Sequence, residues 1–398
     1  MPVAETACID LCCRTSIVNP VARAIFGWSR AYLFWPLAPA AAPIIIIMQQ
    51  SEENPQGAKK KAISSPNSNA MGFIVDICTG ATQGIGRAVA ESIAHHRAME
   101  IASASGDVNT KYALFLVGRN IERGTKAARD IQSKESGGLF SIYFEPCDLS
   151  DWGSVLDLKD RVCRRLDGYI DDDSSRSQQY QIGILVNDAA ECPVQQEFAI
   201  RPKRDQDGKI TSEHIDKQFA SNVMGYHFMI KAFKPHFSSD IRLPQDISKK
   251  THICNIASNW AGDLDLEDLY FRRRSYDNDS AYRQSKQCDR MLTKIWSEKL
   301  VDFAIVNSCH PGDPCTKLSK DLGYNLWAST PTRSFVEDES PIPHLCGFGS
   351  HPLNTTGGWF DGGGRSLRPI RCRFALMKND IQRLFDICDS FAIPKYTL

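Results

Sequence analysis

Residues 73–86 read FIVDICTGATQGIG, and this stretch decides the fold. Its first six residues form a short apolar run with β-branched side chains, and glycines follow at Gly80, Gly84 and Gly86. Apolar residues then recur at helical spacing over residues 85–93. A strand, a glycine turn and a helix in this order present backbone N–H groups and a helix N-terminus to a pyrophosphate. The stretch predicts an α/β fold, a doubly wound parallel sheet of the Rossmann type, with a dinucleotide site at its first turn.

The next apolar run, residues 113–117, bears on the choice of dinucleotide because it ends in Gly118 and Arg119. An acidic residue at this point would hydrogen-bond the ribose 2′-hydroxyl of NAD, whereas an arginine suits the 2′-phosphate of NADP. Arg119 therefore favours NADP over NAD. The alternative is a solvated arginine at the start of a helix. Residues 97–110, which precede this run, are predicted to be an insertion.

The composition is that of a globular protein. Of the 398 residues, 42% are hydrophobic and 24% charged, and 47 Lys and Arg residues balance 47 Asp and Glu residues. These values exclude a disordered chain and lack the basic excess of a general nucleic-acid binder. Fourteen cysteines without a C-x-x-C pair indicate reduced thiols in an intracellular protein. Cys309, His310 and Cys315 lack a fourth ligand at zinc spacing, so we expect no metal site.

Residues 1–70 are predicted to be an N-terminal extension. Residues 31–48 carry no charge and approach the length of a bilayer-spanning helix, although three prolines interrupt them. Three interpretations stay open for this segment: a membrane anchor or interfacial segment, a targeting peptide, and a disordered tail or misassigned start. An anchor would place the protein on an intracellular membrane of the endoplasmic-reticulum type. Residues 51–69 are polar and rich in Pro, Gly and Ser, as in a linker.

Further along the chain, a set of four residues forms a candidate catalytic pattern. Asn222 lies in a helix-like segment, Ser258 ends the strand-like run 251–258, and Tyr282 and Lys286 are four residues apart. On a helix, residues i and i+4 face the same way, so this tyrosine and lysine can address one ligand. Singly, each residue has an ordinary structural role, such as a cap or a surface position. Their joint occurrence in this order after the glycine turn favours a catalytic function.

Together with Thr79 and the three glycines, these residues resemble the short-chain dehydrogenase/reductase family, whose cofactor motif is Thr-Gly-x-x-x-Gly-x-Gly. The resemblance covers about residues 73–391 and implies that residues 71–398 form a single Rossmann domain. It implies an enzyme that uses NAD(P) to move a hydride between the nicotinamide and a small-molecule alcohol or carbonyl. The segments 97–110, 168–180 and 200–210 match weakly and are predicted to be insertions.

The resemblance also implies the catalytic roles. Tyr282 would be the general acid in carbonyl reduction and the general base in alcohol oxidation. Lys286 would lower the pKa of the phenol and bind the nicotinamide ribose, and Ser258 would donate to the substrate oxygen. Asn222 corresponds to the family asparagine that helps to organise a water-linked proton path behind the lysine.

The cofactor contacts of the family can be assigned residue by residue. Asp148-Leu149 matches the pair that contacts adenine, and Asn187-Asp188-Ala189-Ala190 stands where the family has Asn-Asn-Ala-Gly. The Pro-Gly turn at residues 311–312 leads to the threonine that meets the nicotinamide. The full set implied for the cofactor is Thr79, Gly80, Gln83, Gly84, Ile85, Gly86, Arg119, Asp148, Leu149, Asn187, Ala189, Tyr282, Lys286, Pro311, Gly312 and Thr316.

The gap between Ser258 and Tyr282 points to a branch of the family because residues 261–280 lengthen it. Retinol dehydrogenases and the WW-domain oxidoreductase group have a similar gap, and residues 281–286 and 310–312 also resemble them. This branch implies an apolar substrate of retinoid, steroid or lipid type. Two alternatives are a protochlorophyllide-reductase-like enzyme and a non-catalytic NADP-binding regulatory protein. A homodimer is the family default.

Overall fold

The computed structural model describes nine segments of the chain, residues 72–103, 110–135, 140–167, 180–237, 250–324, 330–350, 352–362, 368–369 and 377–393. All of them belong to one compact unit. The predicted extension over residues 1–70, including the apolar stretch 31–48, lies outside these segments. Within them, no helix combines the length and the apolar character that crossing a membrane requires.

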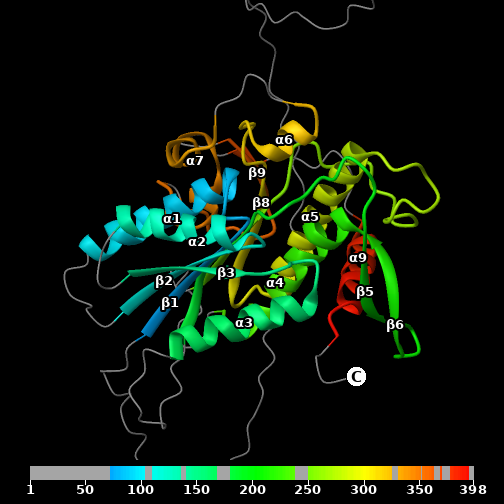
Figure 1. The fold of residues 1–398 in the computed structure, drawn as a ribbon, viewed down its shortest axis with the longest axis horizontal. Helices are drawn as coiled ribbons and strands as arrows, with labels where there is room; N and C mark the ends of the chain where they lie inside the picture. The colour runs from blue at the N-terminus through cyan, green and yellow to red at the C-terminus, as the bar shows by residue number, and fades with distance from the viewer. Residues whose placement is uncertain are drawn as a thin grey trace, which may run out of the picture. The chain divides into compact units, whose positions relative to one another are not determined.

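The core of the described fold is an eight-stranded sheet in the order β10-β9-β8-β7-β4-β1-β2-β3 (Figure 1). Its strands are β1 (Gly72–Thr79), β2 (Thr110–Gly118), β3 (Phe140–Pro146), β4 (Tyr180–Asn187), β7 (Thr251–Ile256), β8 (Ala304–Cys309), β9 (Trp359–Asp361) and β10 (Arg368–Pro369). From β3 across to β9 every pair is parallel, whereas β10 pairs antiparallel with β9. The strand order reverses beside β1, which confirms the doubly wound Rossmann prediction.

Helices cover both faces of this sheet, as its parallel strands require. One layer contains α3 (Trp152–Asp167), α4 (Gly225–Phe233), α5 (Asn278–Lys299) and α9 (Lys378–Ser390). The other contains α1 (Gly84–Ser103), α2 (Ile121–Lys134), α7 (Arg333–Glu339) and α8 (Ile342–Leu345). Side chains of β1 point alternately to the two faces of the sheet. Val75 and Ile77 therefore pack against the first layer of helices and Cys78 against the second.

A separate antiparallel hairpin, β5 (Phe198–Arg204) and β6 (Ile210–Asp216), lies outside the main sheet and beside α9 (Figure 1). It contains the predicted insertion 200–210 and extends beyond it on both sides. The ammonium of Lys203 lies 5.3 Å from the ring centre of Phe391, just after α9. Of the insertion predicted at 168–180, residues 168–179 lie outside the described segments.

The insertion predicted over residues 97–110 begins within α1, because this helix continues to Ser103. Arg97 is 8% exposed and faces the sheet, where its guanidinium bonds both carboxylate oxygens of the fully buried Asp76 in β1. The Nε–Oδ2 and Nη2–Oδ1 distances are 2.7 and 3.0 Å. The long segment after the glycine turn therefore begins with further helix, held to the sheet by a bidentate ion pair.

Candidate active site

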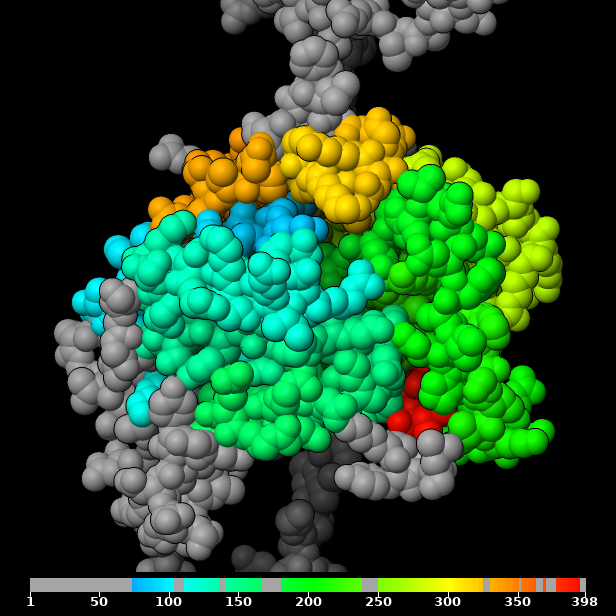
Figure 2. Space-filling view, in the orientation of Figure 1, coloured from blue at the N-terminus to red at the C-terminus, as the bar shows by residue number. Residues whose placement is uncertain are grey.

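A cavity of about 670 Å³ runs along the carboxyl ends of the parallel strands, where sheets of this type bind ligands. Figure 2 shows the surface hollowed where the blue segment at the start of α1, the yellow helix α6 (Lys317–Asp321) and the green segment after β4 meet. Twelve of the sequence-predicted site residues line the cavity: Gly80, Gln83, Gly84, Ile85, Arg119, Asp148, Leu149, Ala189, Tyr282, Lys286, Pro311 and Thr316. Six do not: Thr79, Gly86, Asn187, Asn222, Ser258 and Gly312.

The glycine turn closes tightly on its neighbours. Gly80 and Gly84 have φ angles of +70° and +61°, a left-handed conformation that glycine adopts without strain. A Cβ on Gly86 would lie 2.7 Å from the carbonyl oxygen of Gly80, and a Cβ on Gly80 would lie 2.9 Å from the backbone of Ala189. Side chains at these positions would push α1 and the segment after β4 away from the turn. The two glycines therefore allow the turn, α1 and the segment after β4 to pack closely together.

Two polar residues, Thr79 and Asn187, hold the segments around the glycine turn together by hydrogen bonds. The hydroxyl of Thr79 accepts hydrogen bonds from the backbone N–H groups of Asp188 at 3.0 Å and Ala189 at 3.2 Å. The buried side chain of Asn187 donates to Asn255 of β7 at 2.8 Å. These bonds join the turn after β1, the segment after β4 and the end of β7. Both residues thus shape the site without lining it.

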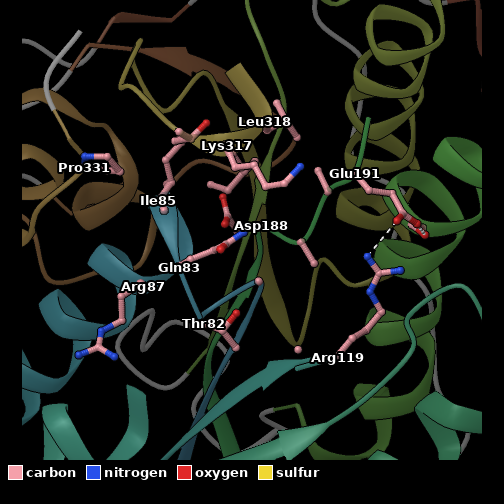
Figure 3. A pocket seen from close by; sticks show the side chains of 18 of the residues that line it. Thr82, Gln83, Ile85, Arg87, Arg119, Asp188, Glu191, Lys317, Leu318 and Pro331 are labelled. Carbon is pink, nitrogen blue, oxygen red and sulfur yellow. Dashed lines mark hydrogen bonds and ion pairs between the residues drawn. The ribbon is translucent and has the colours of Figure 1, made fainter. Parts of the chain in front are cut away.

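The end of the cavity beside β2 is rich in guanidinium groups. Arg119 follows β2 and pairs with Glu191, its Nη2 lying 2.9 Å from Oε2 (Figure 3). Arg123 of α2 also lines the cavity and donates from Nε to the hydroxyl of Thr82 at 3.2 Å. Arg87 of α1 is a third arginine in the lining. The Arg119 side chain is 57% exposed, so its pair with Glu191 is open to solvent and exchangeable.

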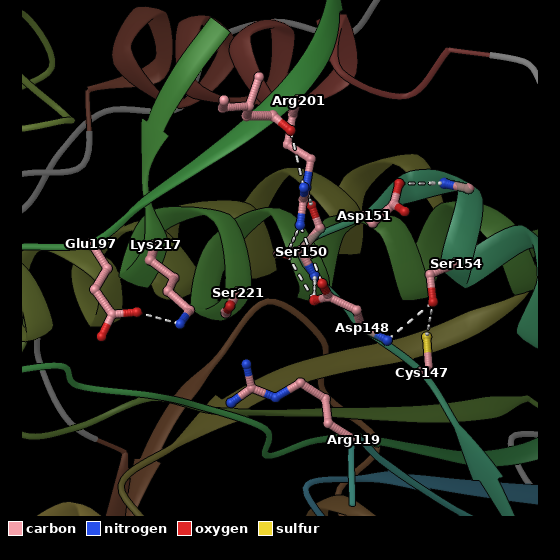
Figure 4. A network of polar contacts seen from close by, with 12 residues as sticks. Arg119, Cys147, Asp148, Ser150, Asp151, Ser154, Glu197, Arg201, Lys217 and Ser221 are labelled. Atoms are coloured by element: carbon pink, nitrogen blue, oxygen red, sulfur yellow. Dashed lines mark hydrogen bonds and ion pairs between the residues drawn. The ribbon is translucent and has the colours of Figure 1, made fainter.

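Asp148, at the position that the resemblance assigns to adenine, is held by a network that Figure 4 shows. Its Oδ1 accepts from the backbone N–H of Ser150 at 3.0 Å and from the Ser150 hydroxyl at 2.7 Å. Its Oδ2 pairs with Arg201 Nη2 at 3.2 Å, and Arg201 Nε donates to the Ser150 carbonyl at 2.8 Å. Arg201 lies in β5, so the hairpin of β5 and β6 supports the part of the cavity that Asp148 lines.

The predicted catalytic residues Ser258 and Tyr282 come together at the other end of the cavity, where α5 passes β7. Asp277 caps this helix by accepting from the backbone N–H of Ser280 at 2.9 Å, which places Tyr282 in the second turn. Tyr282 is 8% exposed and its phenol hydrogen-bonds the Ser258 side chain. Burial raises the pKa of Tyr282 well above its usual value, and the bond to Ser258 acts in the opposite direction. The structure therefore brings two of the four predicted catalytic residues into contact.

Lys286 has a buried partner that the sequence reasoning missed. Its ammonium pairs with Asp289 Oδ2 at 3.0 Å, donates to the Ile256 carbonyl at 2.9 Å, and lies 5.8 Å from the centre of the Tyr282 ring. Burial raises the pKa of Asp289 to about 7, while the charge of Lys286 lowers it. The three-residue spacing of Lys286 and Asp289 could have indicated this pair, because residues three apart on a helix are neighbours.

Asn222 lies in a π-helical segment, Phe219–Met224, which precedes α4. Its Oδ1 accepts from the backbone N–H of Glu191 at 2.9 Å, and its Nδ2 donates to the carbonyl of the same residue at 3.0 Å. The Nδ2 also lies 3.3 Å from the hydroxyl of Ser285 on α5. The side chain therefore fixes the segment after β4, and the water-linked proton path behind the lysine stays a prediction.

The turn after β8 forms the remaining wall. Gly312 has a φ of +98°, and a Cβ there would lie 2.8 Å from the ring of Phe335. Thr316 caps α6, its hydroxyl accepting from the backbone N–H of Ser319 at 3.1 Å. Its methyl group would lie 3.7 Å from a Cβ on Gly84, so this turn approaches the glycine turn across the cavity. No group of three or more His, Cys, Asp or Glu side chains in the described segments is arranged to hold a metal ion.

No family model matches the chain. Retinol dehydrogenase 13 of Mus musculus is 26% identical over 252 residues, which are 62% of this chain and 60% of that protein. Retinol dehydrogenase 13 of Homo sapiens is 24% identical, over 62% of this chain and 61% of that protein. L-xylo-3-hexulose reductase of Hypocrea jecorina (strain QM6a) is 26% identical, over 63% and 70%. The match thus spans about 60% of the length of the retinol dehydrogenases.

The names of these relatives state different substrates, a retinol for the dehydrogenases and a hexulose for the reductase. The aligned stretch of 252 residues is much longer than the glycine turn, so one short motif does not explain the similarity. The same chain folds as a doubly wound sheet and carries Tyr282 against Ser258 at the end of its cavity. The chain is therefore similar to retinol dehydrogenases and to a hexulose reductase, in agreement with its resemblance to the short-chain dehydrogenase/reductase family.

Proposed function

We propose that the protein is an NAD(P)-dependent oxidoreductase that interconverts an alcohol and a carbonyl compound. The observation that carries this proposal is the buried hydrogen bond between Tyr282 and Ser258, at one end of a cavity that the glycine turn also lines. A proton donor at the same cavity as an anion-binding turn is what a dinucleotide-dependent carbonyl reduction needs.

The cavity fits a nicotinamide dinucleotide in size and chemistry. Its volume of about 670 Å³ is in the range of cofactor sites. Gly84 lines the cavity and a Cβ on it would meet nothing nearer than the Thr316 methyl group at 3.7 Å, so the N-terminus of α1 has room for a pyrophosphate beside it. Arg119 and Arg123 supply cations at the end where adenosine would lie. Residues of this chain would thus hold the pyrophosphate and a 2′-phosphate.

The chain itself supplies the proton and its placement. When bound, the nicotinamide would supply or accept the hydride. Tyr282, whose pKa burial raises, keeps its proton at neutral pH and can donate it to a carbonyl oxygen. Ser258 positions the phenol and can donate a hydrogen bond to the same oxygen, where charge develops in the transition state. Lys286 brings a positive charge behind the tyrosine ring.

For the substrate, we propose an apolar carbonyl or alcohol. Ile85, Ile256 and Leu318 give the cavity apolar walls, and Trp260 packs against Tyr324 with ring centres 4.2 Å apart, close in sequence to Ser258 and α6 respectively. The relatives support two classes, since one name states a retinol and another a hexulose.

The purified full chain would test this activity. NADPH and NADH oxidation would be followed with retinoid, steroid, aliphatic and sugar carbonyls, and with protochlorophyllide under illumination. We expect turnover with apolar carbonyls. Turnover with protochlorophyllide alone would support the light-dependent alternative, and cofactor binding without turnover of any class would favour the non-catalytic one.

We also propose that NADP is the preferred cofactor, and Arg119→Asp should shift the preference from NADPH to NADH. A charge-assisted bond to the 2′-phosphate contributes about 1.5–3 kcal/mol, so the ratio of the two dissociation constants should change by about tenfold to a hundredfold. Titration of intrinsic fluorescence with each cofactor measures it. Arg129→Asp, an exposed arginine of α2 outside the cavity lining, is the matched control. An equal shift in both variants would contradict the role of Arg119.

Arg201→Ala should weaken NADPH binding because it releases Asp148. The pair is partly exposed, so we expect a loss of about 1 kcal/mol, or about fivefold in the dissociation constant, with turnover at saturating NADPH unchanged. Lys203→Ala removes another cation of β5, which pairs with Glu213 at 2.7 Å and not with Asp148. The idea fails if both variants bind NADPH like the wild type.

A further inference from the structure

Asp188 lies against the glycine turn. It follows β4, at a position where the family has asparagine, and it lines the cavity (Figure 3). Its Oδ2 is 3.0 Å from the place of a Cβ on Gly80 and 2.6 Å from that of a Cβ on Gly86. It also accepts a hydrogen bond from the backbone N–H of Gly86. The carboxyl group thus contacts both glycines that shape the turn.

This placement puts a carboxyl group in the anion site. Gly86 belongs to the first turn of α1, whose N–H groups lack partners within the helix and would face a pyrophosphate. An ionised Asp188 already uses one of these groups and repels a second anion beside it. A protonated Asp188 carries no charge and, like asparagine, can donate a hydrogen bond.

The groups around Asp188 allow both forms near neutral pH. Burial raises the pKa of Asp188 to about 7, while the positive charge of Lys286 on α5 and the bond from Gly86 lower it. Lys286 is already paired with Asp289, so two carboxyl groups share one ammonium. The other titratable neighbours have raised pKa values and are neutral at pH 7: Tyr282 on α5, Tyr226 on α4, Cys78 on β1 and Cys254 on β7.

We propose that Asp188 determines cofactor affinity by taking up a proton when the dinucleotide pyrophosphate binds. The inference rests on the proposed function, because it requires the cofactor to occupy this cavity. One proton passes from solvent to the carboxylate, and the neutral acid then stands beside the pyrophosphate. Asparagine at this position would bind the cofactor without a proton.

The sign of the pH dependence follows from linkage. In the free protein the carboxyl titrates at about pH 7, and a neighbouring pyrophosphate raises its pKa further. Affinity is therefore constant well below pH 7 and falls as the pH rises above it. If the bound state holds the proton throughout, affinity decreases about tenfold between pH 6 and pH 8.

Calorimetric titration of the full chain with NADPH tests the proposal. At pH 7.5, in buffers of different ionisation enthalpy, the wild type should take up about 0.8 proton per cofactor. Because the 2′-phosphate of NADPH titrates near pH 6, Asp188→Asn supplies the baseline. This variant should take up about 0.8 proton less than the wild type and bind NADPH about tenfold more tightly at pH 8.

Asp289→Asn separates the two carboxyl groups. If its pH dependence resembles that of the wild type while Asp188→Asn loses it, Asp188 carries the proton. The opposite pattern overturns the inference. Should Asp188→Asn not fold, as judged by circular dichroism, the wild-type buffer series decides alone, and zero uptake overturns the proposal. Failure of the wild type to bind either cofactor would instead contradict the proposed function.

Discussion

Tyr282→Phe is expected to reduce turnover at least about a hundredfold, because general acid catalysis by a positioned side chain contributes about 10²–10⁴. Phenylalanine keeps the ring in a position that is 8% exposed, so packing around α5 should persist. What is lost is the phenolic proton and the bond to Ser258. Binding of NADPH should change less than about threefold, because the ring still lines the cavity.

The measurement pairs turnover with cofactor titration on the same preparation. Tyr270→Phe is the matched control, since this tyrosine is equally buried, lies outside the cavity lining and packs against Phe219 with ring centres 5.4 Å apart. It should retain turnover. Full turnover in Tyr282→Phe would refute the assignment of the proton donor.

Arg97→Leu is expected to lower the free energy of unfolding by about 3–5 kcal/mol, the largest stability effect that the structure indicates. The change leaves the carboxyl group of Asp76 fully buried in β1 without its two bonds to the guanidinium. A buried carboxyl that loses its partner must ionise in an apolar layer or take up a proton, and both cost free energy. Because the free energy of unfolding is lower, unfolding should also begin at a lower temperature.

Urea denaturation measures this loss, and two further variants define its origin. Lys126→Ala breaks an exposed pair with Asp130, whose atoms lie 2.9 Å apart, and should cost less than about 1 kcal/mol. Combining Arg97→Leu with Asp76→Leu removes both charges and should recover most of the stability, as replacement of buried pairs by apolar residues often does. A loss below 1 kcal/mol for Arg97→Leu alone would show that Asp76 is not dependent on this arginine.

Structural features that depend on residues close together in the chain were predictable from the sequence. The apolar run before Gly80 and the helical spacing after it predicted β1 and α1, because local sequence determines backbone conformation there. The spacing of Tyr282 and Lys286 likewise predicted that both would line the cavity, since i and i+4 share a helix face. The sequence could not show the length of α1, because no residue before Ser103 marks the end of this helix.

Contacts between distant residues were not predictable. Arg201 reaches Asp148 across 53 positions, and Arg119 reaches Glu191 across 72, with no repeat or motif to mark either pair. Asp188 was visible as a departure from the family pattern, but its closeness to Gly86 depends on how β4 passes β1. Burial decides the chemistry of such groups, and burial is a property of the fold.

The strand order has a consequence for the growing polypeptide. Four neighbouring strands, β3, β2, β1 and β4, come from residues 72–187, so one half of the sheet is complete when less than half of the chain has left the ribosome. Ser258 and Tyr282 emerge later, together with β7 and α5. During synthesis a nascent chain can therefore hold a finished glycine turn well before it holds a proton donor. Turnover has to wait for the second half of the sheet to dock.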